Sequence, residues 1–337
     1  MKIELFDYEL PQKFIAQKPL SRRDESRLLV LDKKSGNMKH DIFYNLSSYL
    51  EKGDVLVVNE SKVTRCRLKG IKEKTGAHIE CFVLNKLGDN QYIALIKPSK
   101  RIKPSDRVTI GEYYFIVKSK LDYGKAVVKF NVPAEIIFKK YGQVPLPPYI
   151  KNTDIKEERY QTIYASREGS SAAPTAGLHF SKRLINKLKR EGIVFAKLNL
   201  DIGLDTFRPI SVDEIEKHKI HSEYYCIEEG EAEKIRFAKN NENKIIAVGT
   251  TVVRVLETLM TRYGKITGDS GMTDIYIYPG YKFKAVDCMI TNFHLPRSTL
   301  LVMVSAFAGR QNILNAYEEA KRKGYRFYSF GDCMLIK

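Results

Sequence analysis

The sequence predicts an α/β protein with a mixed, largely parallel α/β core domain and an inserted small β-barrel domain. Two textures within the 337 residues support this prediction. Outside about 65–150, apolar strand-like runs alternate with helix-like segments, which favours a mostly parallel sheet. Inside that range, short β-rich runs are separated by turn residues, which is typical of a small barrel. We therefore predict a discontinuous core domain (1–64 and 151–337) and a barrel domain (65–150).

The first core element lies in Leu46–Asn59, LSSYLEKGDVLVVN. This stretch predicts a short helix, a glycine stop at Gly53 and then an apolar strand. The barrel prediction depends on five β-rich runs, which are HIECFVLNKL, NQYIALIKP, DRVTIG, YYFIVKSKL and KAVVKFNV. Turn-forming residues separate these runs. PLPPYI at Pro145–Ile150 follows, and its prolines predict a stiff linker.

Three later units share one pattern, an apolar strand followed by a turn of small or hydroxyl residues and then a helix. The strands are QTIYA, KIIAVG and DCMITNF. The turns are GSSAAPTAGLHF, Thr250-Thr251 and HLPRST, and the helices are SKRLINKLKRE, VVRVLETLM and LLVMVSAFAG. Ligands of parallel sheets bind beyond the carboxyl ends of the strands. We therefore expect these three turns to meet in one polar pocket.

The three turns place hydroxyl, imidazole and guanidinium groups near helix N-termini, which attract anions. The candidate groups are Ser170, Thr175, Gly177, His179, Thr250, Thr251, Arg254, His294, Arg297, Ser298 and Thr299. An alternative interpretation is that the hydroxyl residues only cap helices and the small residues only allow close packing. The coincidence of three such turns favours a ligand pocket.

The stretch HKIHSE contains His218, His221 and Glu223. Two histidines three residues apart, together with a carboxylate, could hold a metal ion. The spacing differs from the usual zinc-protease signature, so we expect no metal site. His221 and Glu223 are instead a candidate proton-transfer pair.

Basic residues dominate the charge balance, with 57 Lys and Arg against 40 Asp and Glu and a net charge of +17. Such a field attracts polyanions, of which nucleic acid is the commonest, although a lysine-rich composition alone could explain it. The candidate phosphate contacts are Arg22, Arg23 and Arg27 in SRRDESR, and Lys62 and Arg65 at the expected domain junction.

Several classes of protein are disfavoured. The five cysteines are an odd number without a C-x-x-C pair, so we expect neither a disulfide framework nor a structural zinc site, and a cytoplasmic location fits. The N-terminus lacks a secretory signal, and no uncharged apolar run approaches the roughly 20 residues of a membrane span. The phosphate-binding loop of NTPases, the dinucleotide-binding glycine pattern and the G-x-S-x-G elbow of hydrolases are all absent.

Long motifs spread over the chain resemble those of one family. They include DYELP (7–11), RDESRLLVLD (23–32), GDVLVVNESKV (53–63), PLPPYI (145–150), APTAGLHF (173–180), GLDTFRPI (203–210), HSEYY (221–225), VGTTVVRVLE (248–257), TNFHLPRSTLLVMVSAFAG (291–309) and YRFYSFGDCMLI (325–336). Together they are similar to the S-adenosylmethionine:tRNA ribosyltransferase-isomerase family of queuosine biosynthesis. The resemblance runs essentially from end to end.

This resemblance implies an α/β domain with an inserted barrel that acts as a monomer. It implies S-adenosylmethionine as ribosyl donor, without a permanently bound cofactor. The acceptor would be a 7-aminomethyl-7-deazaguanine base at the wobble position of a tRNA, which becomes epoxyqueuosine while adenine and methionine leave. A non-enzymatic basic tRNA-binding protein and an S-adenosylmethionine-dependent tRNA methyltransferase are the alternatives.

Such a reaction needs a base near the ribosyl carbon beside the sulfonium and an acid near the departing adenine. The resemblance makes His179 and His294 the first candidates, followed by His221 with Glu223. Candidates for contacts to the substrate carboxylate, RNA phosphate or base are Arg208, Arg254 and Arg297.

One departure from the family pattern affects these roles. The family pattern leads us to expect a histidine shortly before the TFRP motif. Here LDIGLDTF carries Asp201 and Asp205 instead. If that histidine were an essential acid or base, Asp201 or another group would have to replace it.

Overall fold

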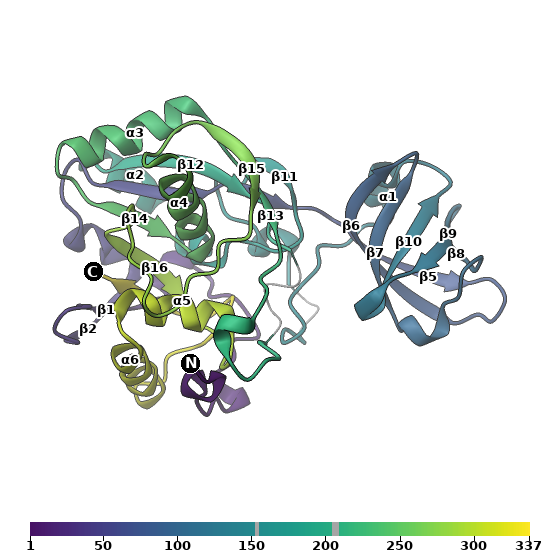
Figure 1. The fold of residues 1–337 in the computed structure, drawn as a ribbon, viewed down its shortest axis with the longest axis horizontal. Coiled ribbons are helices and arrows are strands. Elements are labelled where there is room, and N and C mark those ends of the chain that lie inside the picture. The colour runs from purple at the N-terminus through teal and green to yellow at the C-terminus, as the bar shows by residue number, and fades with distance from the viewer. Residues whose placement is uncertain (152–154, 204–208) are drawn as a thin grey trace. The chain divides into compact units, whose positions relative to one another are not determined.

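The chain forms two units. A computed structural model describes residues 1–151, 155–203 and 209–337. The core unit comprises Met1–Lys62 and Pro147–Lys337, and the barrel unit comprises Val63–Leu146. The core is a mixed α/β domain and the insertion is a closed β-barrel (Figure 1). The predicted fold class is therefore confirmed.

The core unit is built on one mixed sheet. Within the described ranges its strand order is β15, β13, β12, β3, β14, β16, β17, β1 and β2. The bounds are β1 (Arg27–Leu31), β2 (Met38–Ile42), β3 (Val55–Asn59), β12 (Val194–Leu200), β13 (Glu223–Ile227), β14 (Ile245–Val248), β15 (Asp269–Thr273), β16 (Cys288–Asn292) and β17 (Cys333–Ile336). Parallel pairing joins β12, β3, β14 and β16 in the middle and joins β17 to β1. The four central parallel strands therefore end at a common edge.

Helices and turns cover both faces of this sheet (Figure 1). One face packs against α3 (Glu229–Asn240), α4 (Thr250–Tyr263), α5 (Thr299–Ala308) and α6 (Arg310–Arg322). The other packs against α2 (Lys182–Arg190) and a 3-10 turn over Phe43–Tyr49. Alternate residues of β3 serve the two cores, because successive side chains of a strand point to opposite faces. Val57 lies in the first core and Leu56 in the second, and both are fully buried.

The predicted helices after GSSAAPTAGLHF, Thr250-Thr251 and HLPRST are α2, α4 and α5. Ser181 begins α2, because its hydroxyl accepts the Leu184 N–H at 3.1 Å and so satisfies one of the free amides of the first turn. In the described ranges, no helix combines the length and hydrophobicity that crossing a bilayer requires.

Two expectations for the core were wrong in detail. QTIYA is not a strand, and the chain instead forms β11 (Arg167–Ser170), which pairs with β4 (Ser61–Val63) outside the main sheet. Ile163 and Tyr164 instead pack onto a sheet face, and a short apolar run is compatible with either arrangement. The helix expected near Leu46 is the 3-10 turn that ends at Tyr49.

The barrel unit closes in the order β10, β7, β6, β5, β8 and β9. Its strands are β5 (Arg67–Lys72), β6 (His78–Gly88), β7 (Gln91–Lys97), β8 (Arg107–Ile110), β9 (Tyr113–Lys120) and β10 (Lys125–Phe130), followed by helix α1 (Ala134–Tyr141). Five strands match the five β-rich runs, whereas β5 was not among them. Buried residues alternate with exposed or half-buried ones along β7, so one side of that strand faces a separate apolar core.

Asn59 closes the carboxyl end of β3 and provides a test of the core. Its amide donates to the Leu200 carbonyl at 3.0 Å and accepts the Leu200 and Ser61 N–H groups at 3.1 and 3.0 Å. Asn59→Ala would leave these buried backbone groups unpaired. We expect it to lower the free energy of unfolding by roughly 2–4 kcal/mol in urea denaturation.

Asn240→Ala is the matched control, because Asn240 is an exposed residue at the end of α3. We expect it to change the free energy of unfolding by less than about 0.5 kcal/mol. Equal stability of the two variants would contradict the role assigned to Asn59.

Candidate active site

The three predicted turns meet at the carboxyl edge of the central strands. β14 runs directly into Gly249, and β16 ends at Asn292, just before the third turn. The 3-10 turn Thr175–His179 of the first turn contacts β16. The Gly249 N–H donates to the Ile290 carbonyl at 2.8 Å, and a Cβ on Gly249 would lie 3.6 Å from the Cβ of Ala176. Residues far apart in sequence are thereby gathered at one edge.

His179 is buried between two hydrogen-bond partners. Its Nδ1 lies 2.7 Å from Ser26 Oγ, and its Nε2 lies 3.1 Å from Asn292 Nδ2. The same Nδ2 donates to the Tyr328 carbonyl at 3.1 Å, which fixes the orientation of the amide because a carbonyl can only accept. Nε2 therefore accepts a hydrogen bond from Asn292. Nδ1 carries the proton and donates a hydrogen bond to Ser26 Oγ.

Burial, together with the positive charges of Arg326 and Arg23, lowers the pKa of His179 to about 3. The ring is therefore neutral at pH 7. His179 could join a proton transfer only after its bond to Ser26 or Asn292 breaks. In the geometry described, it ties the first turn to β16 and to the N-terminal segment.

His294 is also enclosed, with 8% of its surface exposed. Its Nε2 lies 2.6 Å from Thr291 Oγ1, and its backbone N–H donates to the Tyr317 hydroxyl at 2.9 Å. Burial lowers the pKa of His294 to about 3, so this ring is neutral as well. A cavity of about 30 Å³ lies beside it, lined by Tyr149, Thr175, Asn292, Phe293, His294, Leu295, Ser298, Leu300, Tyr328 and Ser329.

Two of the candidate residues in the turns have clear structural roles. A Cβ on Gly177 would lie 2.1 Å from the hydroxyl oxygen of Tyr164, so this glycine admits a side chain of the protein itself. Ser298 caps α5, because its Oγ accepts the Leu301 N–H at 3.2 Å and donates to the Leu295 carbonyl at 2.7 Å. These contacts account for both residues.

Glu223 and Arg254 form a buried ion pair, with 3% and 5% of their side chains exposed. Glu223 Oε1 also lies 2.9 Å from His221 Nε2 and accepts the Gly203 N–H at 2.9 Å. Burial opposes ionisation of Glu223, but the His221 hydrogen bond and the Arg254 charge outweigh it and hold the pKa of this carboxyl below its usual range. Arg254 donates to the Thr273 carbonyl at 3.1 Å.

The predicted proton-transfer pair is thus brought together, and His221 keeps 28% of its side chain exposed. His218 packs its ring on Tyr276, 5.5 Å away, on the same stretch. In the described ranges, no group of three His, Cys, Asp or Glu that could hold a metal ion is found.

Ser170 links the first turn to this ion pair. Its Oγ accepts the Ile202 N–H at 2.9 Å, one residue before the Gly203 amide that Glu223 holds. Burial raises the pKa of Asp201, against the effect of a 2.9 Å hydrogen bond from Asn199. The segment in which the resemblance leads us to expect a histidine therefore presents a half-buried carboxyl group.

The remaining residues of the second and third turns lie close to the same edge. Thr250 and Thr251 are buried in the first turn of α4, and Thr299 is half-buried at the start of α5. Arg297 instead pairs with Asp7 at 2.5 Å, so it holds the N-terminal segment.

Several buried polar atoms at this edge lack a hydrogen-bond partner within the described ranges. They are Asn199 Oδ1, Thr251 Oγ1, Arg254 Nε and Asn292 Oδ1. An unsatisfied buried polar atom disfavours the folded state, so such atoms need an explanation and are rare outside sites that receive a ligand or water. Other such atoms lie elsewhere in the described ranges, so these four support the edge as the candidate active site only together with the three turns that meet there.

The predicted phosphate contacts are scattered over two units. Arg22 is exposed and pairs with Glu25, and Lys62 pairs with Glu168 at 2.9 Å. The Arg23 guanidinium is half-buried, and Arg27 is exposed while donating to the Lys323 carbonyl at 2.5 Å. Arg65 is exposed and belongs to the barrel unit. Arg208 and Asp205 lie outside the described residues.

Sequence inspection missed residues that hold the site together. Ser26 and Asn292 fix the tautomer of His179, and Asn199 supports Asp201. A usable signal existed for the asparagines, because Asn199 and Asn292 come at the ends of apolar runs that form β12 and β16.

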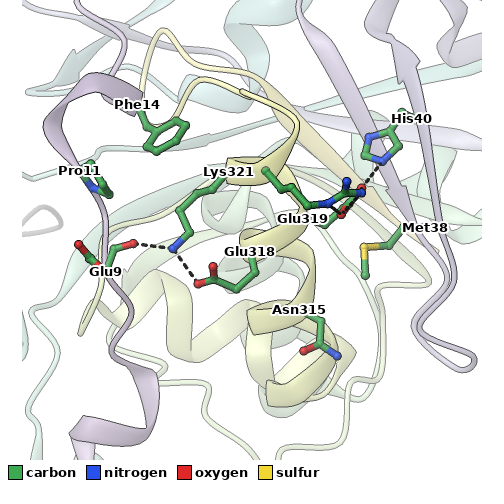
Figure 2. Close-up of a pocket in the computed structure, with 10 residues that line it drawn as sticks. Glu9, Pro11, Phe14, Met38, His40, Asn315, Glu318, Glu319 and Lys321 are labelled. Carbon is green, nitrogen blue, oxygen red and sulfur yellow. Dashed lines mark hydrogen bonds and ion pairs between the residues drawn. The ribbon is translucent and has the colours of Figure 1, made fainter.

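A large open pocket lies elsewhere in the core, with a volume of about 770 Å³. Figure 2 shows its lining, which comes from the N-terminal segment, β2 and α6. Its charged groups largely pair with one another, since Lys321 contacts Glu318 and His40 contacts Glu319. It contains no predicted site residue, so its size does not make it the reaction site.

Comparison with known proteins identifies the family. The family model described as queuosine biosynthesis protein matches residues 3–336. The chain belongs to this family. A relative from Moorella thermoacetica, named S-adenosylmethionine:tRNA ribosyltransferase-isomerase, is 50% identical over 100% of both chains. A relative of the same name from Staphylococcus saprophyticus is 48% identical over 100% of both chains.

A solved structure is also similar to this member of the family. The crystal structure of S-adenosylmethionine tRNA ribosyltransferase from Thermotoga maritima is 37% identical, with a TM-score of 0.58. The similarity covers 99% of this chain and 100% of that chain. The family resemblance stated from the motifs is therefore confirmed.

The depressed pKa of His179 predicts a pH-dependent stability. The unfolded histidine gains a proton below about pH 6.5, whereas the folded one does so only near pH 3. Stability is therefore full above pH 6.5 and falls as the pH drops towards 3, by up to about 1.4 kcal/mol per pH unit for this residue. We expect His179→Gln to flatten the loss of unfolding free energy between pH 7 and 4.

His78→Gln is the control, since His78 is exposed on the barrel. It should retain the slope of the wild-type protein in urea denaturation at each pH. A His179→Gln profile parallel to that of the wild type would show that burial does not keep this ring neutral.

Proposed function

We propose that this chain transfers and isomerises the ribosyl group of S-adenosylmethionine onto a 7-aminomethyl-7-deazaguanine base in a tRNA anticodon, with release of adenine and methionine. The full-length relatives carry the name of this activity. The structural observation that supports it most is the meeting of the three turns at the carboxyl edge of the central strands. In the described ranges, buried polar atoms of Asn199, Thr251, Arg254 and Asn292 lack a hydrogen-bond partner there.

We assign the proton transfer at the ribosyl carbon to His221 with Glu223. The pair is in hydrogen-bond contact, and His221 is the reachable partner, whereas His179 and His294 are enclosed. The ionised Glu223 orients the ring and stabilises its protonated form after it has taken a proton. Asp201 is a second candidate, because a carboxyl whose pKa is raised can donate a proton to the departing adenine.

Arg254 has two roles in this proposal. It neutralises Glu223 in the interior, and its buried Nε has no hydrogen-bond partner in the described ranges. A guanidinium in this position suits the carboxylate of the methionine group. We further propose that the protein acts as a monomer in the cytoplasm, which its five free cysteines suit.

The products decide between the candidate activities. Purified protein with S-adenosylmethionine and a tRNA that bears the deazaguanine base should release adenine and methionine in equal amounts, measured by liquid chromatography. The same tRNA with an ordinary guanine should give neither. Formation of S-adenosylhomocysteine would indicate a methyltransferase, and absence of any product despite RNA binding would indicate a binding protein.

The assignment of His221 predicts a kinetic effect. His221→Gln should lower kcat by roughly a hundredfold or more, because general base catalysis typically contributes at least that factor. Its melting temperature should change little, since the side chain is part-exposed. His218→Gln is the matched control from the same stretch and should keep nearly full kcat. An equal loss in both variants would remove His221 from the chemistry.

A further inference from the structure

Three arginines from distant segments converge on one small cavity in the core unit. Arg23 comes from the N-terminal segment, Arg159 from a turn over Glu157–Tyr160, and Arg326 from the connection between α6 and β17. The cavity has a volume of about 20 Å³ and is also lined by Ser26, Leu178, His179, Ser329, Phe330 and Gly331, among others. We call Arg23, Arg159 and Arg326 the arginine cluster.

Two members of the arginine cluster donate hydrogen bonds to main-chain carbonyls. Arg23 donates to the carbonyls of Gln161 and Glu158 at 2.6 and 2.7 Å. Arg159 donates to the carbonyls of Ser21 and Leu20 at 3.0 and 2.5 Å. The two segments thus clasp each other, but a carbonyl carries only a partial charge. Neither guanidinium is neutralised by these bonds.

Arg326 is only weakly compensated. Its guanidinium lies 3.5 Å from Asp332 and 3.4 Å from the Lys18 carbonyl, and both distances are long. The Asp332 carboxylate is already occupied by the backbone N–H groups of Arg27 and Arg326 at 2.9 and 2.8 Å. Asp332 therefore only partly offsets the charge of Arg326.

The two acidic residues that follow Arg23 in the sequence pair with other groups. Asp24 accepts from Ser181 and lies 3.4 Å from Arg183, and Glu25 pairs with Arg22. Burial lowers the pKa of Arg23, and the positive charge of the adjacent Arg159 lowers it as well. Arg159 Nε is a buried donor without a hydrogen-bond partner in the described ranges. The cavity is therefore a positive, partly desolvated site, and in the described ranges the ion pair of the cluster is the long one between Arg326 and Asp332.

We propose that the arginine cluster is a preformed site for one phosphate group of an RNA strand. Planar guanidinium forks match phosphate oxygens, and each still has donors beyond those bonded to carbonyls. A volume of about 20 Å³ corresponds to one or two water molecules, so no nucleoside fits and only oxygens of an oxyanion group can reach the guanidinium groups. The rest of the ligand must therefore stay outside, on a surface where Lys18 and Arg22 are exposed. A phosphodiester in a long polyanion meets both requirements.

This site adjoins the candidate active site. Ser329 lines both the arginine cavity and the cavity beside His294, and His179 lies between Ser26 and Asn292 on the same boundary. A phosphate held here would set the register of the RNA relative to the reacting groups. The inference rests on the proposed RNA substrate, and it adds Arg159 and Arg326 to the residues that bind it.

Arg326→Gln is the informative variant, because Arg326 makes the longest hydrogen bonds of the cluster and its loss leaves the clasp intact. Binding of an unmodified tRNA transcript, without S-adenosylmethionine, is measured by fluorescence anisotropy over a series of salt concentrations. We expect affinity to fall roughly tenfold at about 0.1 M salt. The slope of log affinity against log salt should become shallower by about 0.7–1, the value of one phosphate contact.

Two further variants separate the charge from the fork. Arg326→Lys should restore most of the salt slope but not the full affinity, because it keeps the charge without the planar donors. Arg322→Gln removes an exposed arginine that pairs with Glu319 in the pocket of Figure 2, and it should bind RNA like the wild type. Melting temperatures of all variants exclude unfolding as the cause.

An unchanged salt slope and affinity in Arg326→Gln would overturn the proposal. A raised KM for S-adenosylmethionine with unchanged RNA binding would also overturn it, and would assign the cavity to the carboxylate of the donor. Because binding is measured without turnover, these outcomes are independent of adenine release by the wild type. Failure of that release would refute the proposed function while leaving the phosphate site to be judged on binding alone.

Discussion

A buried polar group must find a partner, and this constraint organises the carboxyl edge of the core sheet. Leaving one unpaired disfavours folding by about 1–3 kcal/mol. Central parallel strands covered on both faces end in a dry environment, where water cannot satisfy their last backbone groups. Asn59, at the end of β3, donates to the Leu200 carbonyl at the end of β12, and Asn292, at the end of β16, donates to the Tyr328 carbonyl. The turns that carry the candidate chemistry are positioned by these bonds.

The same constraint separates the histidines into two kinds. His179 and His294 are buried and neutral, so they stabilise the edge through hydrogen bonds. His221 lies against an ionised Glu223 and retains contact with solvent, so it can exchange a proton and be steadied in its charged form. A histidine that stays neutral needs burial, whereas one that takes up a proton needs access to solvent and a nearby negative charge. The fold provides both within one edge of a single sheet.

Sequence reasoning recovers the fold class because periodicity and turn residues are local signals. It identifies β14 with α4 and β16 with α5, and it finds five of the barrel strands. It misassigns QTIYA because a short apolar run can equally well pack against the face of a sheet, as Ile163 and Tyr164 do. For the site, residue type alone cannot distinguish the enclosed His179 from the accessible His221. Nor does it reveal that Gly177 makes room for Tyr164.

The arginine cluster differs from other cations of the chain in how its charge is compensated. Some cations of this strongly basic chain lie beside carboxylates, as Lys62 does with Glu168. At the cavity, by contrast, the terminal nitrogens of Arg23 and Arg159 donate hydrogen bonds to main-chain carbonyls. Lysine could not replace them, because one compact ammonium group cannot clasp a neighbouring segment and still present a second face. A guanidinium can do both, since its donors point in fixed and different directions. Arginine at these positions can therefore hold the local fold together and bind an anion at the same time.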